Sequence, residues 1–250
     1  MNKIIVEENV MSPAEIFMKL MQDALNNEAN SQESHGENKP SLRNFELLPN
    51  CFLKSEVKVY YSLDYYYRKH PLNPNFILTL KNTYNYNGYN YLRELDEACE
   101  TLANIVSDAI KEIAQYEDFN TICVVPRSKA RHTYIKDQLR FLYTIKGIIG
   151  ELKNDGYFHF EDGSDYIIRH TNTLTTHLAK SGYGGDGEAP YPGITTNTCN
   201  ISSNIRGKRI LLIDDIYTKN TNVDEDCIQA LFDNGAESVV LYTIGRTVKK

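Results

Sequence analysis

The sequence lacks the features that define several large classes of protein. It has no run of 18 apolar residues, so we expect no membrane-spanning helix. Its first residues, MNKIIVEENVMSPAEIF, lack the apolar core of a secretory signal. Its five cysteines are scattered and form no CxxC pair, which argues against a structural zinc site and against a disulfide framework. This cysteine usage favours the reducing cytoplasm.

The charge balance restricts the class of partner. The formal net charge of −6 argues against broad nucleic-acid binding, although a local basic cluster can still hold one phosphate compound. With 250 residues, of which 41% are hydrophobic and 24% charged, the chain has enough apolar material for a real core. We therefore expect one ordinary domain with additions, or two small ones.

The N-terminal part is predicted to be a helix on a tether. Within residues 1–26, MSPAEIFMKLMQDAL has Ser12 as a helix N-cap and an apolar face at helical spacing. That face must pack on the main domain, on a second copy of the chain or on a partner protein. Residues 27–44 are almost entirely polar and are predicted to be a flexible linker.

Residues 45–118 are expected to pack against the core. This segment is rich in tyrosine, and VKVYYSL (57–63) and FILTL (76–80) are predicted to be strands or core segments. Apolar residues recur at helical spacing from Leu92 to Tyr116, which predicts a long helix that covers the core.

From residue 119 onward, strand and helix patterns alternate. FNTICVVP, DYIIRH, RILLIDDI and SVVLYTIGR are predicted strands, whereas TLTTHLAKS and NVDEDCIQALFDNG are predicted helices, and RSKARHTYIKDQLRFLYTIKGII is a predicted loop that runs into a helix. This alternation favours an α/β fold with a mostly parallel sheet covered on both faces. Ligands of such sheets bind at the carboxyl ends of the strands, where Asp214 and Asp215 are expected.

Two carboxylates that follow a buried strand also occur in two other kinds of protein. A Walker B strand requires a GxxxxGK[ST] loop elsewhere in the chain, and the sequence has none. A phosphoacceptor receiver carries its acids early, with several strand–helix units still to come. Here only residues 216–250 follow, which is enough for one helix and one strand. Neither the Walker B nor the receiver interpretation therefore fits, because the chain lacks the loop that the first requires and the later strand–helix units that the second requires.

A third interpretation comes from ILLIDDIYTKNTN, which resembles the motif of type I phosphoribosyltransferases that binds phosphoribosyl pyrophosphate (PRPP). In that family an apolar strand leads to two acids that hydrogen-bond the ribose 2′ and 3′ hydroxyls, so the resemblance implies this catalytic role for Asp214 and Asp215. Backbone N–H groups at a helix N-terminus suit a phosphate. The resemblance implies a 5′-phosphate loop of Thr218, Lys219, Asn220, Thr221 and Asn222.

Two other segments resemble the same family. FILTLKNTYNYNGYNYLRELDEACETLANIVSDAI is similar to the segment before the core in the competence-associated, amidophosphoribosyltransferase-like branch, and the resemblance extends over residues 58–246. The basic loop in ICVVPRSKAR resembles the family's pyrophosphate loop. Basic and hydroxyl groups belong there because leaving pyrophosphate carries several negative charges. The implied donors are Arg127, Ser128, Lys129 and Arg131.

The resemblance implies a type I phosphoribosyltransferase fold in residues 119–250, with a hood-like insertion at 155–205 and a twisted, mostly parallel sheet flanked by helices. It implies a cytoplasmic, Mg²⁺-dependent glycosyltransferase of nucleotide metabolism, which transfers phosphoribosyl from PRPP to a nitrogen nucleophile and releases pyrophosphate. The partner would be a small ribose phosphate, and Mg²⁺ would be bound through PRPP rather than directly by the protein. Tyr217 and Arg169 are candidate contacts for the acceptor.

A second hypothesis is a catalytically inactive phosphoribosyl-fold sensor or a scaffold subunit of a larger assembly. Asn220 replaces the glycine that is usual in the phosphate loop, and Lys219 replaces the second threonine. The first turn of the predicted helix contains Asp224, Glu225 and Asp226. Acids at this position stabilise the helix through its dipole but repel a bound phosphate. At about 6 Å and an effective dielectric constant of about 20, each pair of like unit charges costs about 3 kcal/mol.

Overall fold

A six-stranded sheet forms the centre of the computed structural model, which describes residues 40–66, 70–82, 89–174, 193–219 and 221–248. All neighbouring strands are parallel except the first pair, β1 and β2, which is antiparallel. The predicted α/β class with a mostly parallel sheet is therefore confirmed. The spatial order of strands is β1 (Arg43–Leu47), β2 (Val57–Tyr66), β8 (Ser238–Val248), β7 (Arg209–Tyr217), β3 (Thr121–Val124) and β4 (Glu161–Asp162).

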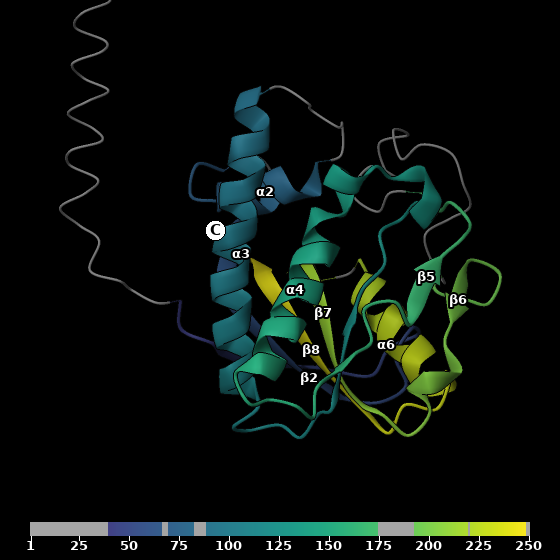
Figure 1. The fold of residues 1–250 in the computed structure, drawn as a ribbon. Coiled ribbons are helices and arrows are strands. Elements are labelled where there is room, and N and C mark those ends of the chain that lie inside the picture. The colour runs from purple at the N-terminus through teal and green to yellow at the C-terminus, as the bar shows by residue number, and fades with distance from the viewer. Residues whose placement is uncertain (1–39, 67–69, 83–88, 175–192, 220, 249–250) are drawn as a thin grey trace, which may run out of the picture. The chain divides into compact units, whose positions relative to one another are not determined.

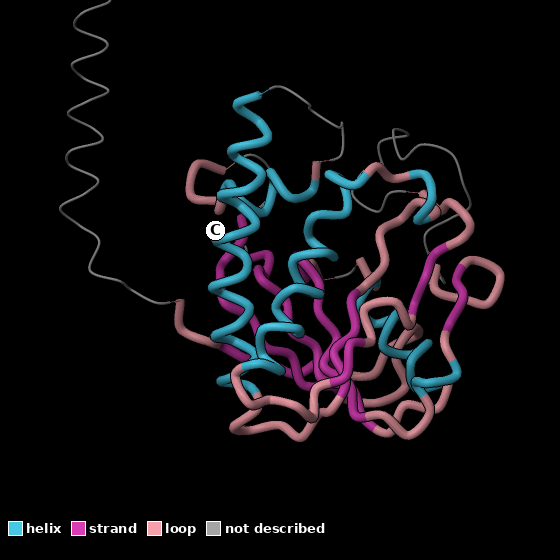
Figure 2. The backbone as a smooth tube through the Cα atoms, in the orientation of Figure 1, coloured by secondary structure: helices cyan, strands magenta, loops and turns pink. Residues whose placement is uncertain are grey.

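Helices cover both faces of this sheet, and α3 and α4 run side by side across one of them (Figure 1). On that face lie α2 (Asn75–Lys81), α3 (Tyr89–Ile113) and α4 (Arg140–Asn154). The other face is covered by α6 (Val223–Asp233) and by a small antiparallel sheet of β5 (Ile167–Arg169) and β6 (Cys199–Ile201). Figure 2 shows the same layers by secondary structure. Short 3-10 segments lie at Arg131–Thr133, Lys136–Leu139 and Ser203–Ile205.

The apolar run in β7 explains why this strand lies inside the sheet. Successive side chains of a strand point to opposite faces. Leu211 and Ile213 belong to the core under α2, α3 and α4, whereas Ile210 and Leu212 belong to the core under α6. All four are fully buried, as expected for a parallel strand that is covered on both sides.

The long helix predicted from Leu92 to Tyr116 is present as α3. Leu95, Leu102, Val106 and Ile110 are completely buried and lie seven, four and four residues apart, which places them on one face of the helix. The helix begins three residues earlier than predicted and ends three residues earlier.

The segment FILTL is the helix α2, so the prediction of a strand there is wrong, although its placement in the core is right. Ile77 and Leu80 are buried while Leu78 between them is exposed, which is the spacing of a helix face. Pro74 precedes the helix and Asn82 ends it in the left-handed conformation, with φ of 33°.

Two boundaries differ from the predicted organisation, and one predicted strand lies outside the main sheet. Arg43 and Asn44, placed in the linker 27–44, are the first residues of β1 and pair with Tyr61 and Tyr60. Glu161–Asp162, placed in the insertion 155–205, pairs in parallel with β3 and so belongs to the main sheet. The predicted strand DYIIRH is β5, which lies in the small sheet.

Some predictions fall on parts of the chain that the structure does not describe. The helix within residues 1–26, most of the linker and most of TLTTHLAKS are outside the described residues. Within the described ranges, none of the helices combines the length and the apolar character that crossing a membrane requires.

Candidate functional site

A cavity of about 310 Å³ lies at the carboxyl ends of β3 and β7. Most of its wall comes from the end of β7, the loop after β3, the helix α2 and the start of α6, and α3, α4 and β8 each contribute one residue. The structure therefore brings the two predicted acids and the predicted basic loop to one place. The polar lining residues are Lys81, Arg127, Ser128, Lys129, Tyr134, Asp214, Asp215, Thr221 and Asp224, and apolar ones include Phe76, Ile77, Leu80, Phe141, Ile216 and Ile244.

The pairing of β3 with β7 explains where the cavity opens. Val124 is the last residue of β3 to pair with β7, opposite Ile213, and the Val125 N–H donates to the Ile213 carbonyl at 3.0 Å. Beyond this point β3 gives way to the loop at Pro126, while β7 continues to Tyr217. Asp214 and Asp215 therefore lie where β7 has no neighbour on its β3 side.

Asp215 is ion-paired with Lys81, the last residue of α2. The Lys81 Nζ lies 2.8 Å from Asp215 Oδ2, and both side chains are about three-quarters buried. Burial acts to lower the pKa of Lys81, but the Asp215 carboxylate beside it outweighs burial and raises that pKa above its usual value. Lys81 is therefore a fixed positive charge in the wall of the cavity.

Asp214 faces Asp224 in the first turn of α6. Asp224 is only 1% exposed and lines the same cavity as Asp214, and its Oδ1 atom is buried without a hydrogen-bond partner among the described residues. Burial, reinforced by the charge of Asp215, raises the pKa of Asp214 from 3.8 to about 7. Burial, reinforced by Asp214, also raises the pKa of Asp224 well above its usual range. The Asp224 side chain thus points into the site.

The next two acids of α6 also point inward, but to other partners. The Tyr217 hydroxyl donates to Glu225 Oε1 at 3.2 Å. The N–H groups of Gly193 and Ile194 donate to Asp226 Oδ2 at 2.6 and 2.8 Å. Burial raises the pKa of both carboxyls.

Tyr217, a candidate acceptor contact, is packed away from the cavity. Its ring belongs to the apolar core under α6 and lies 5.1 Å from the ring of Phe45. Burial, together with the nearby Glu225, raises the pKa of its hydroxyl. The structure therefore gives Tyr217 a packing role.

Arg127 and Lys129 line the same cavity as the acids, and the protein itself orients both. The Arg127 guanidinium donates to the carbonyls of Gln138 and Lys81, each at 2.6 Å, and lies 4.7 Å above the Tyr134 ring. The Lys129 Nζ donates to the Thr173 carbonyl at 3.1 Å. Arg127 and Lys81 are thus linked directly, which couples the basic loop to the acids.

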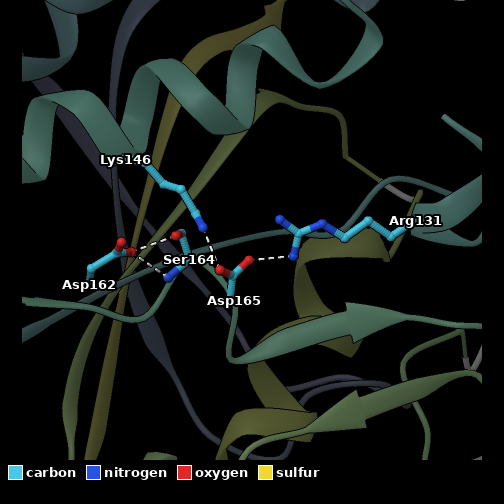
Figure 3. Close-up of polar contacts among 5 residues, drawn as sticks. All are labelled: Arg131, Lys146, Asp162, Ser164 and Asp165. Atoms are coloured by element: carbon cyan, nitrogen blue, oxygen red, sulfur yellow. Dashed lines mark hydrogen bonds and ion pairs between the residues drawn. The ribbon is translucent and has the colours of Figure 1, made fainter. Parts of the chain in front are cut away.

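Arg131 and Arg169, two other predicted contacts, lie around a smaller neighbouring pocket of about 60 Å³. Arg131 is ion-paired with Asp165, which also binds Lys146 of α4 (Figure 3). Arg169 is 95% buried and donates to the carbonyls of Arg127 and Gly193 at 2.7 Å each. Arg169 therefore holds the backbone of the basic loop in place.

The predicted phosphate loop is a tight turn before α6. The Thr221 N–H and hydroxyl both donate to the Thr218 carbonyl, at 3.1 and 2.7 Å, and the Thr218 hydroxyl bonds that of Thr247 at 2.7 Å. Asn222, at the helix N-cap, has φ of 56°. Lys219 is exposed, and Asn220 lies outside the described residues. Within this loop, Thr221 lines the cavity.

The acids do not form a metal site by themselves. Across the described ranges, no group of three or more His, Cys, Asp or Glu side chains has an arrangement that could hold a metal ion. Magnesium usually keeps several waters and binds through substrate phosphates with one or two carboxylates. A magnesium ion here would accordingly depend on the phosphates of a bound ligand for most of the negative charge around it.

Sequence reasoning missed the roles of two residues in this site. Lys81 occurs in the Leu-Lys dipeptide of the resembling segment, and that dipeptide is the signal that could have identified it. The sequence pattern indicates Asp224 only as a negative charge near the phosphate.

Comparison with protein-family models and with curated proteins finds no match for the chain.

Proposed function

We propose that the chain has a type I phosphoribosyltransferase fold and binds PRPP or a related ribose phosphate in the 310 Å³ cavity. The proposed reaction is transfer of phosphoribosyl to a nitrogen nucleophile with release of pyrophosphate. The observation that carries this proposal is the juxtaposition of Asp214 and Asp215 with the Arg127–Lys129 loop across one cavity. A ligand with vicinal hydroxyls at one end and phosphates at the other matches that polarity.

The acids suit the ribose. Carboxylate oxygens accept hydrogen bonds from vicinal hydroxyls. As the bond from C1 to the pyrophosphate oxygen breaks, positive charge develops on the ribose, and Asp215 and Asp214 would stabilise it. The bond from C1 to the nitrogen forms, the nitrogen loses a proton to solvent or to a nearby base, and pyrophosphate leaves with the electron pair of the broken bond.

The basic loop suits the leaving group. Arg127 and Lys129 supply positive charge that is already oriented by bonds to backbone carbonyls, so little rearrangement would be needed as pyrophosphate separates. Mg²⁺ bound together with pyrophosphate would neutralise part of its charge. Thr221 and the N-terminus of α6 are proposed to hold the 5′-phosphate.

The size of the cavity and the cysteine usage fit this proposal. About 310 Å³ is within the range of about 300–1,000 Å³ that is usual for small-molecule sites. The cytoplasm is the proposed location, because scattered cysteines without CxxC pairs favour a reducing compartment.

A catalytically inactive sensor or scaffold subunit is the alternative, and the inward-pointing acids of α6 favour it. Asp224, Glu225 and Asp226 are each at least 93% buried, so their charge is not turned to solvent. Lys81 and Arg127 already have partners within the protein. A site of this kind could bind a ribose phosphate and keep it intact.

Pyrophosphate release distinguishes the two candidates. The protein would be incubated with PRPP, Mg²⁺ and a panel of nucleophiles that includes ammonia, purines and pyrimidines. For the enzyme, one nucleophile supports release, and Asp215→Asn lowers the rate by about 100-fold or more. Asp233→Asn, at the exposed end of α6, is the control and keeps the native rate. Binding of PRPP without release for any nucleophile would support the sensor instead.

A further inference from the structure

The smaller pocket of about 60 Å³ adjoins the large cavity, and the proposed function gives it no ligand. Both are lined by the end of β3 and by the basic loop, so the loop separates them. None of the described residues that line the smaller pocket is an aspartate or a glutamate. Its basic lining residues are Arg127, Lys129, Arg131 and Arg169. The pocket is therefore positively charged.

Arg169 carries a charge that its contacts within the protein do not explain. Only 5% of this residue is exposed, and its guanidinium donates to the carbonyls of Arg127 and Gly193. A neutral donor could make both bonds. Asp226 acts on Arg169 through charge, but its Oδ2 accepts two backbone N–H groups, and no described carboxylate forms an ion pair with Arg169.

A buried charge without a contacting counter-charge calls for a ligand. Arginine is almost never fully buried unless it is paired, because an uncompensated charge away from water is costly. The N–H groups of Arg169 that do not bond Arg127 and Gly193 have no hydrogen-bond partner among the described residues. Since Arg169 lines the pocket, these donors and this charge are placed to bind an anion there.

Arg131 adds to the excess of positive charge. Its partner Asp165 lies between Arg131 and Lys146 and is ion-paired with both (Figure 3). One carboxylate offsets only one of these two cations. Arg131 lines the pocket, whereas Lys146 is not among its described lining residues.

The rest of the lining and the size of the pocket indicate which anion fits. Apolar side chains make up much of the wall, among them Val125, Leu139, Leu142 and Ile167. A guanidinium is planar and matches the two oxygens of a carboxylate. A cavity of about 150 Å³ holds benzene, so a pocket of less than half that volume suits a carboxylate on a short apolar group.

We propose that this pocket binds the carboxylate group of a small, partly apolar molecule, and that Arg169 and Arg131 hold the carboxylate. The site goes beyond the proposed function and does not depend on binding of PRPP. Because the basic loop lines both the pocket and the large cavity, two sources of the carboxylate are distinguished below: the nitrogen nucleophile itself and a separate molecule.

Titration of the native protein with propanoate, followed by NMR in the absence of PRPP, tests the site directly. We expect the side-chain N–H signals of Arg131 and Arg169 to shift, with a Kd below about 10 mM. Propanamide has the same shape without the charge and should bind at least about tenfold more weakly. Equal binding of the two, or no binding at about 50 mM propanoate, would overturn the proposal.

Arg131→Gln is the variant of choice, because Arg169 also holds the backbone of the basic loop. It should weaken propanoate binding by about tenfold, since a charged hydrogen bond is lost. Lys146→Gln is the matched control: both side chains pair with Asp165 and are similarly exposed, at 25% for Arg131 and 27% for Lys146. The control should keep native affinity. An equal loss in both variants would overturn the proposal.

Pyrophosphate release identifies the source of the carboxylate. If the nucleophile carries it, propanoate inhibits release competitively against the nucleophile that supports the reaction. If propanoate binds and leaves release unchanged, the carboxylate belongs to a separate molecule. If propanoate binds while no nucleophile supports release, the proposed transfer reaction fails and the carboxylate site stands.

Discussion

At the scale of single residues, the charge of the cavity depends on which partner each carboxylate has. Asp215 has Lys81, whereas Asp214 lines the cavity with another acid, Asp224. The two neighbouring acids of the motif therefore differ: Asp215 is balanced by a cation, whereas burial and the charge of Asp215 raise the pKa of Asp214. The same type of residue at adjacent positions has acquired different chemistry because alternate residues of a strand face different neighbours.

The Lys81–Asp215 pair should contribute measurably to stability. A double-mutant cycle with Lys81→Met and Asp215→Asn, followed by urea unfolding, is expected to give a coupling free energy of about 1–2 kcal/mol, since the pair is partly shielded from water. The exposed pair of Lys54 and Asp233, at 3.1 Å with side chains 73% and 56% exposed, is the control. Its coupling should be below about 0.5 kcal/mol. Equal couplings for the two pairs would contradict the importance of burial.

Gly163 should tolerate no side chain. A Cβ atom there would lie 2.7 Å from both the Cys123 Sγ and the Thr121 Cγ2, and both partner residues are fully buried in β3. Gly163→Ala should therefore lower the free energy of unfolding by about 1–3 kcal/mol. Gly147→Ala in α4, where nothing lies within 4 Å, should instead raise it by about 0.5–1 kcal/mol. Urea unfolding of both variants measures the difference, and a neutral Gly163→Ala would refute the packing described.

At the scale of elements, the first turn of α6 is held against two other parts of the fold, β7 and the segment before β6. Glu225 accepts from the Tyr217 hydroxyl, and Asp226 accepts from two N–H groups in the segment before β6. Acids at a helix start usually serve to favour the helix dipole. Here they also fix the position of the helix relative to the sheet, which in turn positions Thr221.

Removal of the Asp226 carboxylate should loosen the segment before β6. Asp226→Ala leaves the N–H groups of Gly193 and Ile194 without their acceptor and should lower the free energy of unfolding by about 2 kcal/mol. Asp226→Asn keeps one acceptor oxygen and should lose less. Amide hydrogen exchange at Gly193 and Ile194 should accelerate in the alanine variant. Unchanged exchange at both amides would show that Asp226 does not hold this segment.

At the scale of the whole molecule, the raised pKa of Asp214 makes stability depend on pH. The raised pKa of Asp214 means that the folded protein keeps a proton which the unfolded chain loses above about pH 4. The free energy of unfolding should therefore fall, by at most about 1.4 kcal/mol per pH unit, as pH rises from about 4 to about 7. Asp214→Asn should make this fall smaller. An identical fall in the variant, measured by urea unfolding at each pH, would argue against a raised pKa at Asp214.

The sequence was sufficient to predict the central layers of the molecule. Periodicity identified α3, α6, β2, β7 and β8, because their apolar residues repeat at the spacing of the face that they bury. It failed for α2, where an apolar run too short to show a clear period was predicted to be a strand. The short strands β1, β4 and β6 were missed, because their pairing is decided by neighbours distant in the sequence.

The site was predictable in its main parts but not in its charge balance. Asp214, Asp215 and the Arg127–Lys129 loop lie together, because parallel strands place their carboxyl ends at one edge. The inward direction of Asp224 depends on how α6 is rotated against the sheet. That rotation follows from packing of the whole helix, which a short motif does not encode.

The central claim is that the cavity binds a ribose phosphate, and calorimetry with PRPP and Mg²⁺ at about pH 7 tests it most directly. We predict saturable heat with a Kd below about 1 mM, a loss of at least about tenfold in affinity for Asp215→Asn, and native affinity for Asp233→Asn. Absence of any binding heat for the folded native protein at millimolar PRPP would contradict the account.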